Sequence, residues 1–273
     1  MELKPAHTLT VEQLAKLFNE AFAGYIGGNV QFTAAALARF LARDAVDLDL
    51  SQVFMRDDQA IGFGYVARHG WTSRLAAFGV VPAAAGAGVG KAAMRAMIEQ
   101  ARARGDHDYG LEVIEQNTRA VKLYQGVGFE IVRRLVGYTA ENVTGEAAEL
   151  REVDVYDAAR VMIEHEAPGL PWQVAGATLM RHAPPDVAYE LDGATAILSN
   201  PSGAVVALRA MIVAPELRRQ GRATRLLKAL FAAYPEKKWV VSATCPEEIG
   251  GELLAGLGFE RQAITQWQMR LGL

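Results

Sequence analysis

The sequence has little cysteine and no excess of basic charge. Cys245 is the only cysteine among 273 residues, which excludes an intrachain disulfide and a metal site built from several thiolates. Lys and Arg total 28 against 31 Asp and Glu, giving a net charge of −3. Because nucleic-acid-binding proteins usually present a basic face, the composition predicts no nucleic-acid partner.

Long apolar runs are also missing. The longest uncharged run, Leu75 to Gly90, contains Pro82 and is too short to span a bilayer. The first residues, Met1 to Pro5, show no apolar core of a signal peptide. We therefore expect no membrane partner and a cytoplasmic location. The length suits two hydrophobic cores better than one.

A repeated pattern supports two domains. Pro82 is followed by Gly88, and Pro215 by Gly221, at the same spacing. The segments 123–130 and 253–260 share five of eight residues. An offset of about 130 residues indicates duplicated domains rather than a solenoid. We therefore predict domains at residues 1–143 and 144–273.

Helical and strand-like segments alternate in each copy, which indicates an α/β fold. The predicted helices are 11–22, 33–43, 91–104, 118–126, 155–166, 223–233 and 248–256. The predicted strands are 51–56, 60–68, 75–81, 109–114, 130–138, 187–191, 194–199, 204–213, 239–243 and 263–270, with a linker at 141–149.

Each copy also has a strand, a glycine-containing loop and a helix in direct succession. Copy one carries Ala85-Gly86-Ala87-Gly88-Val89-Gly90, and copy two carries Arg218-Arg219-Gln220-Gly221-Arg222-Ala223. Glycines let the backbone approach an anion closely, and a helix start offers unpaired N–H groups. Arginines add charge-assisted bonds to phosphate. Both loops are therefore predicted to hold a pyrophosphate group.

Two other phosphate loops fit less well. A Walker A loop needs Ser or Thr where Gly90-Lys91 is followed by Ala92. A dinucleotide fingerprint needs two residues between its second and third glycines, whereas Gly86, Gly88 and Gly90 are evenly spaced. A plain tight turn between strand and helix stays open as the alternative.

With a second motif added, the chain resembles the GCN5-related N-acetyltransferase (GNAT) superfamily. In the loop, Val213, Pro215, Arg218, Gly221 and Ala223 match the family pattern completely, while copy one has Ala85 at the usual Arg or Gln position. The second motif, found in copy one, comprises Leu111-Glu112-Val113, Asn117, Ala120, Leu123-Tyr124 and Gly128-Phe129.

The resemblance implies two tandem domains, each a mixed, mostly antiparallel sheet flanked by helices. It also implies direct acetyl transfer from acetyl-CoA to a primary amine of a small molecule or peptide, without a metal. The implied acetyl-CoA contacts in copy one are Val80, Ala85, Gly86, Ala87, Gly88, Val89, Gly90, Lys91 and Asn117. Those in copy two are Val213, Arg218, Arg219, Gln220, Gly221, Arg222 and Ala223.

Two residues are candidates for catalysis. Tyr124 has a phenol that is protonated at neutral pH, so it can donate a proton to the leaving thiolate. Glu112 is a candidate base, which requires burial to raise its pKa or a water relay. The alternatives are a half-buried helix aromatic for Tyr124, a strand-end hydrogen-bond partner for Glu112, and a helix cap for Asn117.

Copy two lacks these groups, with Leu254 at the Tyr124 position and Glu247 at the Asn117 position. We therefore expect copy one to be catalytic and copy two to bind acyl-CoA or to be structural. A non-catalytic acyl-CoA-binding regulator remains the alternative function, and a homodimer stays open.

Some other polar residues look tempting as functional groups. We interpret Asp44, Asp47 and Asp49 as a solvated acidic loop, with attraction of a cationic amine as the alternative, and 106–108 as a loop. His165 is assigned to a solvated helix face, and Cys245, just past a strand, to a small buried hydrophobe.

Overall fold

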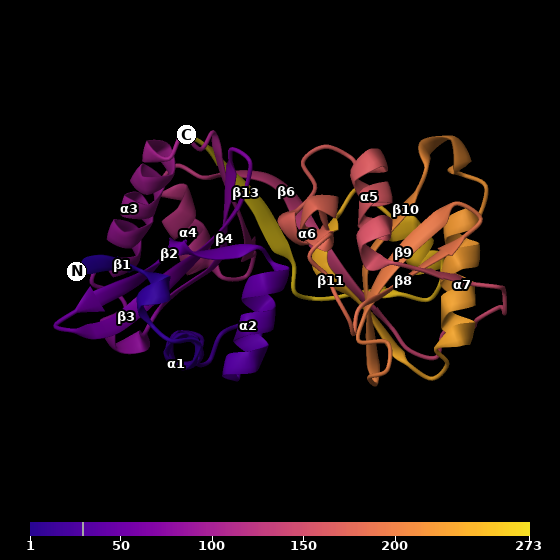
Figure 1. The fold of residues 1–273 in the computed structure, drawn as a ribbon, viewed down its shortest axis with the longest axis horizontal. Coiled ribbons are helices and arrows are strands. Elements are labelled where there is room, and N and C mark those ends of the chain that lie inside the picture. Colours follow the sequence, from indigo (N-terminus) through magenta and orange to yellow (C-terminus); the bar gives the residue numbers. More distant parts are fainter. Residues whose placement is uncertain (29) are drawn as a thin grey trace. The chain divides into compact units, whose positions relative to one another are not determined.

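The computed structural model describes residues 1–28 and 30–273. The chain forms two compact units (Figure 1). Unit 1 comprises Met1–Arg133 and Trp267–Leu273, and unit 2 comprises Arg134–Gln266. The last seven residues therefore return to unit 1, and each unit is described by itself below.

Unit 1 is built on a mostly antiparallel sheet with the strand order β1-β2-β3-β4-β5-β13. Its β4 and β5 are parallel neighbours, whereas β1–β2, β2–β3 and β3–β4 are antiparallel. The strands are β1 (Glu2–Pro5), β2 (Val46–Arg56), β3 (Gln59–His69), β4 (Thr72–Val80), β5 (Asp108–Ile114) and β13 (Gln266–Gly272).

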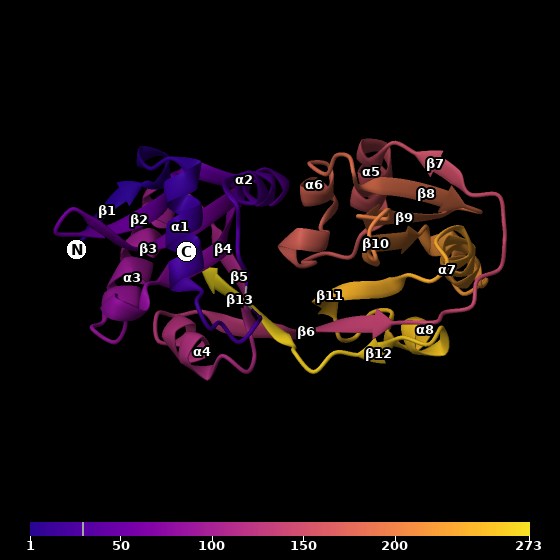
Figure 2. The same ribbon diagram turned by 90° about the horizontal axis from the view of Figure 1, so that it is seen from below.

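The helices of unit 1 cover both faces of this sheet (Figure 2). One face carries α1 (Val11–Ala21) and α2 (Ala34–Arg43), and the other carries α3 (Val89–Ala103) and α4 (Thr118–Gln125). Short 3₁₀ turns lie at η1 (Ala6–Thr8) and η2 (Pro82–Ala84).

Local sequence explains where these helices begin. Thr10 and Gln13 form a reciprocal capping box at α1, and the Thr33 hydroxyl accepts the Ala36 amide at 3.2 Å. Thr33, the first residue of the predicted helix 33–43, is thus the N-cap of α2. Against the sheet, α3 buries an apolar stripe, and a Cβ on Gly64 of β3 would lie only 2.5 Å from the Met97 sulfur. Glycine therefore permits the close approach of helix and strand.

Unit 2 repeats this arrangement in the sheet order β6-β11-β10-β9-β8-β7, with β12 also paired to β6. Strands β10 and β11 pair in parallel, whereas β6–β11, β6–β12, β9–β10, β8–β9 and β7–β8 are antiparallel. The strands are β6 (Glu130–Ala140), which begins in unit 1, β7 (Arg151–Val153), β8 (Val187–Leu191), β9 (Ala194–Ser199), β10 (Val205–Val213), β11 (Lys238–Pro246) and β12 (Glu260–Arg261).

Alternating side chains of β9 divide the core of unit 2 between two faces. Ile197 packs in a cluster with Ala159 of α5, whereas Leu198 packs in another with Leu226 of α7. The helices are α5 (Val155–His165), α6 (Gly176–Leu179), α7 (Arg222–Ala233) and α8 (Gly251–Gly256), with 3₁₀ turns η3 (Trp172–Val174) and η4 (Pro215–Leu217).

The C-terminal strand differs from its expected role as the closing strand of copy two. From Trp267 onward it belongs to unit 1, where Met269 is 1% exposed in the core. The Arg270 Nε donates to Asp108 Oδ1 at 2.7 Å, and the Leu273 amide donates to the His107 carbonyl at 2.9 Å. The sequence copies and the compact units therefore do not share the same boundaries.

No helix within residues 1–28 and 30–273 has both the length and the apolar character needed to cross a bilayer.

Candidate functional site

The parallel strands of unit 1 separate part-way along their length. Paired positions run from Thr72 with Asp108 to Leu75 with Leu111. The register between β3 and β4 shifts at the next residue, Ala76, which is an extra residue in β4. A bulge bends and twists its strand. Because the pairing of β4 with β5 ends at Leu75 with Leu111, the two strands separate beyond this point and leave a splayed end.

The predicted loop of copy one follows β4 directly. Gly86 and Gly88 adopt left-handed φ values of 89° and 76°, which glycine tolerates without strain. Residues 85–88 are exposed, and Gly88 caps α3. The Ala92 amide donates to the Gly88 carbonyl at 3.0 Å. The amides that precede Ala92 in the helix have no acceptor within the helix and point along its positive end. This is a geometry suited to an anion.

The predicted contact residues that flank this loop differ in exposure. Val80 ends β4 and is half-buried, Val89 is buried under the first turn, and Lys91 is exposed. A Cβ on Gly90 would lie 3.5 Å from Leu123 of α4, an ordinary contact.

Loop two has the same backbone but different side chains. Gly221 caps α7 at φ 73°, and Arg219 occupies the left-handed region at φ 61°. Arg222 donates to the Asp192 carbonyl and, at 3.3 Å, to Gln220 Oε1. Arg218 donates from Nε to the Val213 carbonyl at 2.9 Å. Several of the predicted phosphate donors are therefore held by contacts within unit 2, with Ala223 beside them in the first turn of α7.

Tyr124 of α4 lies at the splayed end of unit 1. Its ring meets Phe78 of β4 edge-on, with centroids 6.4 Å apart, and the residue is 7% exposed. Burial, with a contribution from Tyr25, raises the pKa of the Tyr124 phenol well above its ordinary value near 10. The phenol therefore stays protonated at neutral pH and keeps a proton to donate.

Tyr25 links this phenol to Asn117. The Tyr25 and Asn117 side chains share a hydrogen bond, and burial raises the pKa of Tyr25 despite that bond. Asn117 Oδ1 also accepts the Ala120 amide at 3.2 Å, so it caps α4 as well. The cap that was the alternative interpretation of Asn117 is present together with the hydrogen bond to Tyr25.

Glu112 is held by a buried arginine. Arg74 Nε donates to Glu112 Oε2 at 2.7 Å, and Arg74 Nη1 donates to Asp44 Oδ2 at 3.4 Å. The three side chains are 4–6% exposed. Burial opposes the charge on Arg74, but Glu112 and Asp44 outweigh it and raise the pKa of its guanidinium. The ion pair joins β4 to β5 beside the last paired position, Leu75 with Leu111.

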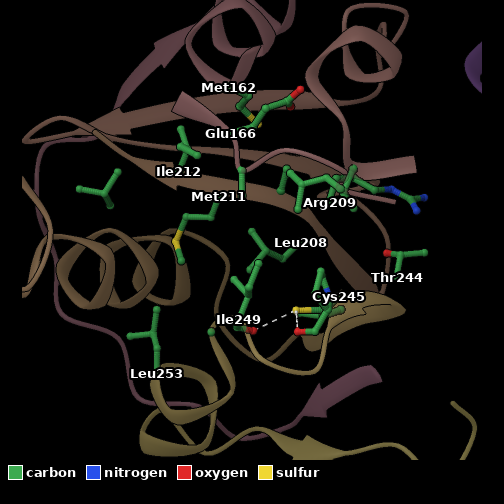
Figure 3. A pocket seen from close by; sticks show the side chains of 18 of the residues that line it. Met162, Glu166, Leu208, Arg209, Met211, Ile212, Thr244, Cys245, Ile249 and Leu253 are labelled. Carbon is green, nitrogen blue, oxygen red and sulfur yellow. Dashed lines mark hydrogen bonds between the residues drawn. The ribbon is translucent and has the colours of Figure 1, made fainter. Parts of the chain in front are cut away.

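Unit 2 contains an open cavity at its own splay. Its parallel pairing ends at Ala207 with Val240, and Arg209 is the extra residue at the β9–β10 bulge. The cavity of ≈ 470 Å³ lies next to this point. Figure 3 shows side chains from α5, β10 and α8 around it. Aliphatic groups dominate the wall and include Met162, Leu170, Val174, Leu208, Met211, Ile212, Val241, Leu253 and Leu254.

This geometry agrees with comparisons to known proteins. Residues 11–129 match the acetyltransferase (GNAT) family. The tandem GNAT protein from the clavulanic acid biosynthesis pathway superposes with a TM-score of 0.67 and 17% identity, covering 99% of this chain and 98% of that one. Residues 11–129 therefore belong to the GNAT family, and the whole chain has the fold of a tandem GNAT protein. It is an acyltransferase.

Other solved structures also share the fold of this chain. A protein from Pyrococcus horikoshii gives a TM-score of 0.72 at 17% identity, covering 100% of this chain and 89% of that one. A GCN5-related N-acetyltransferase from Sphaerobacter thermophilus gives 0.67 at 13% identity, covering 96% and 92%. No curated protein matches in sequence.

Three expectations for polar residues of the GNAT chain were wrong. Asp44 is buried in the Arg74 contact rather than in a solvated loop. Cys245 lies within β11 rather than past a strand, and its buried thiol has a pKa raised to about 11. His165 lines the cavity of unit 2 rather than belonging only to a solvated helix face.

Asp106 lies in the loop before β5, as predicted, and its side chain is buried. Burial raises its pKa, but hydrogen bonds from Ser73, Arg68 and Arg104 outweigh this effect and hold the pKa below its ordinary range. The distances to these donors are 2.7, 2.7 and 2.8 Å. Asp106 therefore anchors the loop before β5.

Sequence reasoning missed Tyr25, Arg74 and the wall of the unit 2 cavity. An arginine inside the otherwise uncharged segment 72–80 was a usable signal, because a buried charge needs a partner. Tyr25 stands among Gly24, Gly27 and Gly28, but only its contact with Asn117 marks it as part of the site.

Proposed function

We propose that unit 1 transfers an acetyl group from acetyl-CoA directly to a primary amine of a small molecule or peptide. The observation that carries the proposal is the protonated, buried phenol of Tyr124 beside the splayed ends of β4 and β5. The anion-binding backbone at Gly86 and Gly88 lies at the end of the same strand.

The start of α3 binds the pyrophosphate of acetyl-CoA in this proposal. Backbone amides supply the donors, and the helix dipole favours the negative charge. Lys91 is exposed in the first turn and adds a positive charge. Loop one thus lacks the arginines of loop two and offers an exposed backbone and one lysine instead.

The transfer proceeds in one displacement. The neutral amine forms a bond to the thioester carbonyl carbon, and the bond from that carbon to sulfur breaks. Tyr124 donates its proton to the departing thiolate, while the amine proton passes to a base or to water. Because the Glu112 carboxylate accepts a hydrogen bond from Arg74, we propose that its main role is to hold β4 and β5 together. Its role as a base stays a prediction.

Unit 2 favours a different function, which is binding without transfer. Leu254 replaces the phenol and forms part of the cavity wall. Glu247 replaces Asn117 and pairs with Arg261 at 2.6 Å and with Arg134 at 3.6 Å. The alternative of an acyl-CoA-binding regulator therefore applies best to this half.

A screen of amines tests the proposal. Purified protein is mixed with acetyl-CoA and a panel of small amines and peptides, and released CoA thiol is measured with and without EDTA. We expect release that depends on one class of primary amine and is unchanged by EDTA. Binding of acetyl-CoA without release for any amine would contradict the transfer and favour the regulator. The proposal requires no nucleic acid or membrane and fits a cytoplasmic location.

A further inference from the structure

We infer that Tyr25 is a second catalytic phenol of unit 1, which takes the proton of the attacking amine and passes its own proton to Tyr124. This inference rests on the proposed acetyl transfer and names the group that accepts the amine proton. Tyr25 lies in the segment between α1 and α2, outside both sequence motifs of copy one.

Packing fixes the Tyr25 ring at the end of β5. The ring meets Phe22 edge-on, with centroids 4.8 Å apart and an interplanar angle of 69°. A Cβ on Gly27 would lie 2.8 Å from Cε1 of Tyr25 and 2.8 Å from Cδ1 of Ile114. Glycine therefore allows this segment to lie against Ile114, the last residue of β5. Asn117 follows three residues later, so the Tyr25 ring lies where α4 begins.

The Tyr124 side chain points toward the same place along α4. Asn117 and Tyr124 are seven residues apart, which is close to two helical turns, so they share one face of the helix. Side chains of a helix lean toward its N-terminus, and the phenol of Tyr124 therefore points back toward Asn117. Phe78 and Phe129 hold its ring edge-on, with centroids at 6.4 and 6.0 Å. The effect of Tyr25 on the pKa of Tyr124 agrees with this placement.

The hydrogen bond between Tyr25 and Asn117 leaves the Tyr25 proton available. Asn117 Oδ1 accepts the Ala120 amide at 3.2 Å. Burial raises the pKa of Tyr25, and the bond with Asn117 lowers it, as donation from the Asn117 amide to the phenol oxygen does. With Asn117 as the donor in this bond, the Tyr25 hydroxyl can donate its own hydrogen to Tyr124.

The two phenols differ in exposure. Tyr124 is 7% exposed, whereas Tyr25 is half-buried and precedes Ile26, which is 49% exposed. Burial raises the pKa of both phenols, but the bond with Asn117 offsets part of this rise for Tyr25. Tyr25 is thus the stronger acid, and its proton moves favourably to a Tyr124 that has given its proton away.

The proton balance closes within the two phenols. Once the amine has attacked, its nitrogen and the sulfur are bound to the same carbon, so a phenol beside Tyr124 reaches the nitrogen. As the C–N bond forms and the C–S bond breaks, the N–H proton moves to the Tyr25 oxygen. The Tyr25 proton moves to Tyr124, and the Tyr124 proton moves to sulfur. The products are the amide and the CoA thiol, both phenols are restored, and Glu112 can remain with Arg74.

A double-mutant cycle tests the relay. Single-turnover rate constants are measured with acetyl-CoA and the best amine of the screen for the wild type, Tyr25→Phe, Tyr124→Phe and the double variant. Tyr25→Phe should lower the rate constant about 10²-fold, the lower end of the range for acid–base catalysis, because water accepts the proton in part. The dissociation constant of acetyl-CoA should not change. In the Tyr124→Phe background, Tyr25→Phe should cost little more, whereas effects that multiply would overturn the inference.

The pH profile separates a relay from a positioning role. In Tyr25→Phe the rate should keep rising with pH where the wild type has levelled off, because hydroxide then accepts the amine proton. Phe22, Gly27 and Ile114 around the Tyr25 ring carry no charge, and Tyr124 is its neighbouring titratable group. A rate lowered by the same factor at every pH would show that Tyr25 only positions Tyr124, and would overturn the relay.

Tyr234→Phe is the matched control. It removes a half-buried phenol from unit 2, where the hydroxyls of Tyr189 and Tyr234 share a hydrogen bond at 2.6 Å, and it should leave the rate unchanged. If the wild type releases thiol and Tyr25→Phe releases it equally fast, this inference alone is refuted. If no amine supports release by the wild type, the proposed transfer is refuted and the relay with it.

Discussion

Unit 1 and unit 2 share a strand, a bulge, a glycine-capped helix and a splay, yet the splays hold different side chains. The bulges lie at Ala76 and Arg209. Two residues beyond each bulge stand Phe78 and Met211. Where unit 1 has Tyr124 packed against an aromatic ring, unit 2 has Leu254 on the wall of a cavity.

The same contrast extends to charge. Arg74 lies two residues before its bulge and binds two carboxylates, whereas Ala207 holds the matching place in unit 2. The backbone that we propose binds a pyrophosphate is therefore retained in both units. The group proposed for proton transfer, Tyr124, and the charged contact that joins β4 to β5 are found in unit 1. The fold sets where a ligand lies, and a few side chains set what happens to it.

The largest expected effect distinguishes the two loops by the same substitution in each. Gly88→Glu should abolish acetyl transfer, because a carboxylate would repel the pyrophosphate at the start of α3. Gly221→Glu should leave most of the transfer. Both glycines have nearly the same φ, 76° and 73°, and open space around a Cβ, so backbone strain is matched. Steady-state thiol release is the measurement, with Gly→Ala variants as controls for strain. The opposite ranking would make unit 2 the catalytic half.

The next largest effect tests whether Tyr124 has a catalytic role that Leu254 cannot have in unit 2. Tyr124→Phe should lower kcat by about 10²–10⁴-fold, the range for loss of a general acid, with little change in acetyl-CoA affinity. The phenol acts on the leaving sulfur, so its loss appears in the transition state. Single-turnover kinetics with calorimetric binding separate the two quantities. An unchanged chemical rate would leave Tyr124 as a packing residue, as Leu254 is.

A smaller effect concerns stability. Arg74→Met should lower the free energy of unfolding by about 3 kcal/mol, because it removes the Arg74 cation from two buried carboxylates, of which Asp44 keeps its pair with Arg43 at 3.2 Å. Arg102→Met is a matched control on an exposed pair with Glu99, expected to cost at most about 1 kcal/mol. Urea denaturation measures both.

Glu112→Gln distinguishes the two roles of this carboxylate. If it leaves stability unchanged but removes transfer and alters the pH profile, Glu112 is the base rather than a strand contact.

The smallest effect is the shape of the pH profile. Transfer should rise about tenfold per pH unit while the amine is protonated, then level off as it becomes neutral. Burial raises the pKa of Tyr124, so its acid form persists above the ordinary value near 10. The rate should therefore show no fall below pH 10. A fall with a midpoint below 10 would mean that Tyr124 titrates as an exposed phenol or that another acid operates.

Much of the fold followed from local sequence. Thr33 begins a helix because its hydroxyl accepts an amide within one turn. Gly88 and Gly221 cap helices because their φ values suit glycine. The duplication at Pro82 and Pro215 indicated two similar halves. These features depend on neighbours within a few residues, so a linear pattern records them.

Tertiary structure decided the rest. The last strand lies in unit 1, because Met269 enters its core and Arg270 binds Asp108, which is distant in sequence. Glu112 binds Arg74 across two strands, and Tyr25 reaches Asn117 from a segment nearly a hundred residues earlier. Burial and pairing are set by neighbours in space, and a carboxylate or a phenol has the same letter in the sequence whether it is solvated, paired or enclosed.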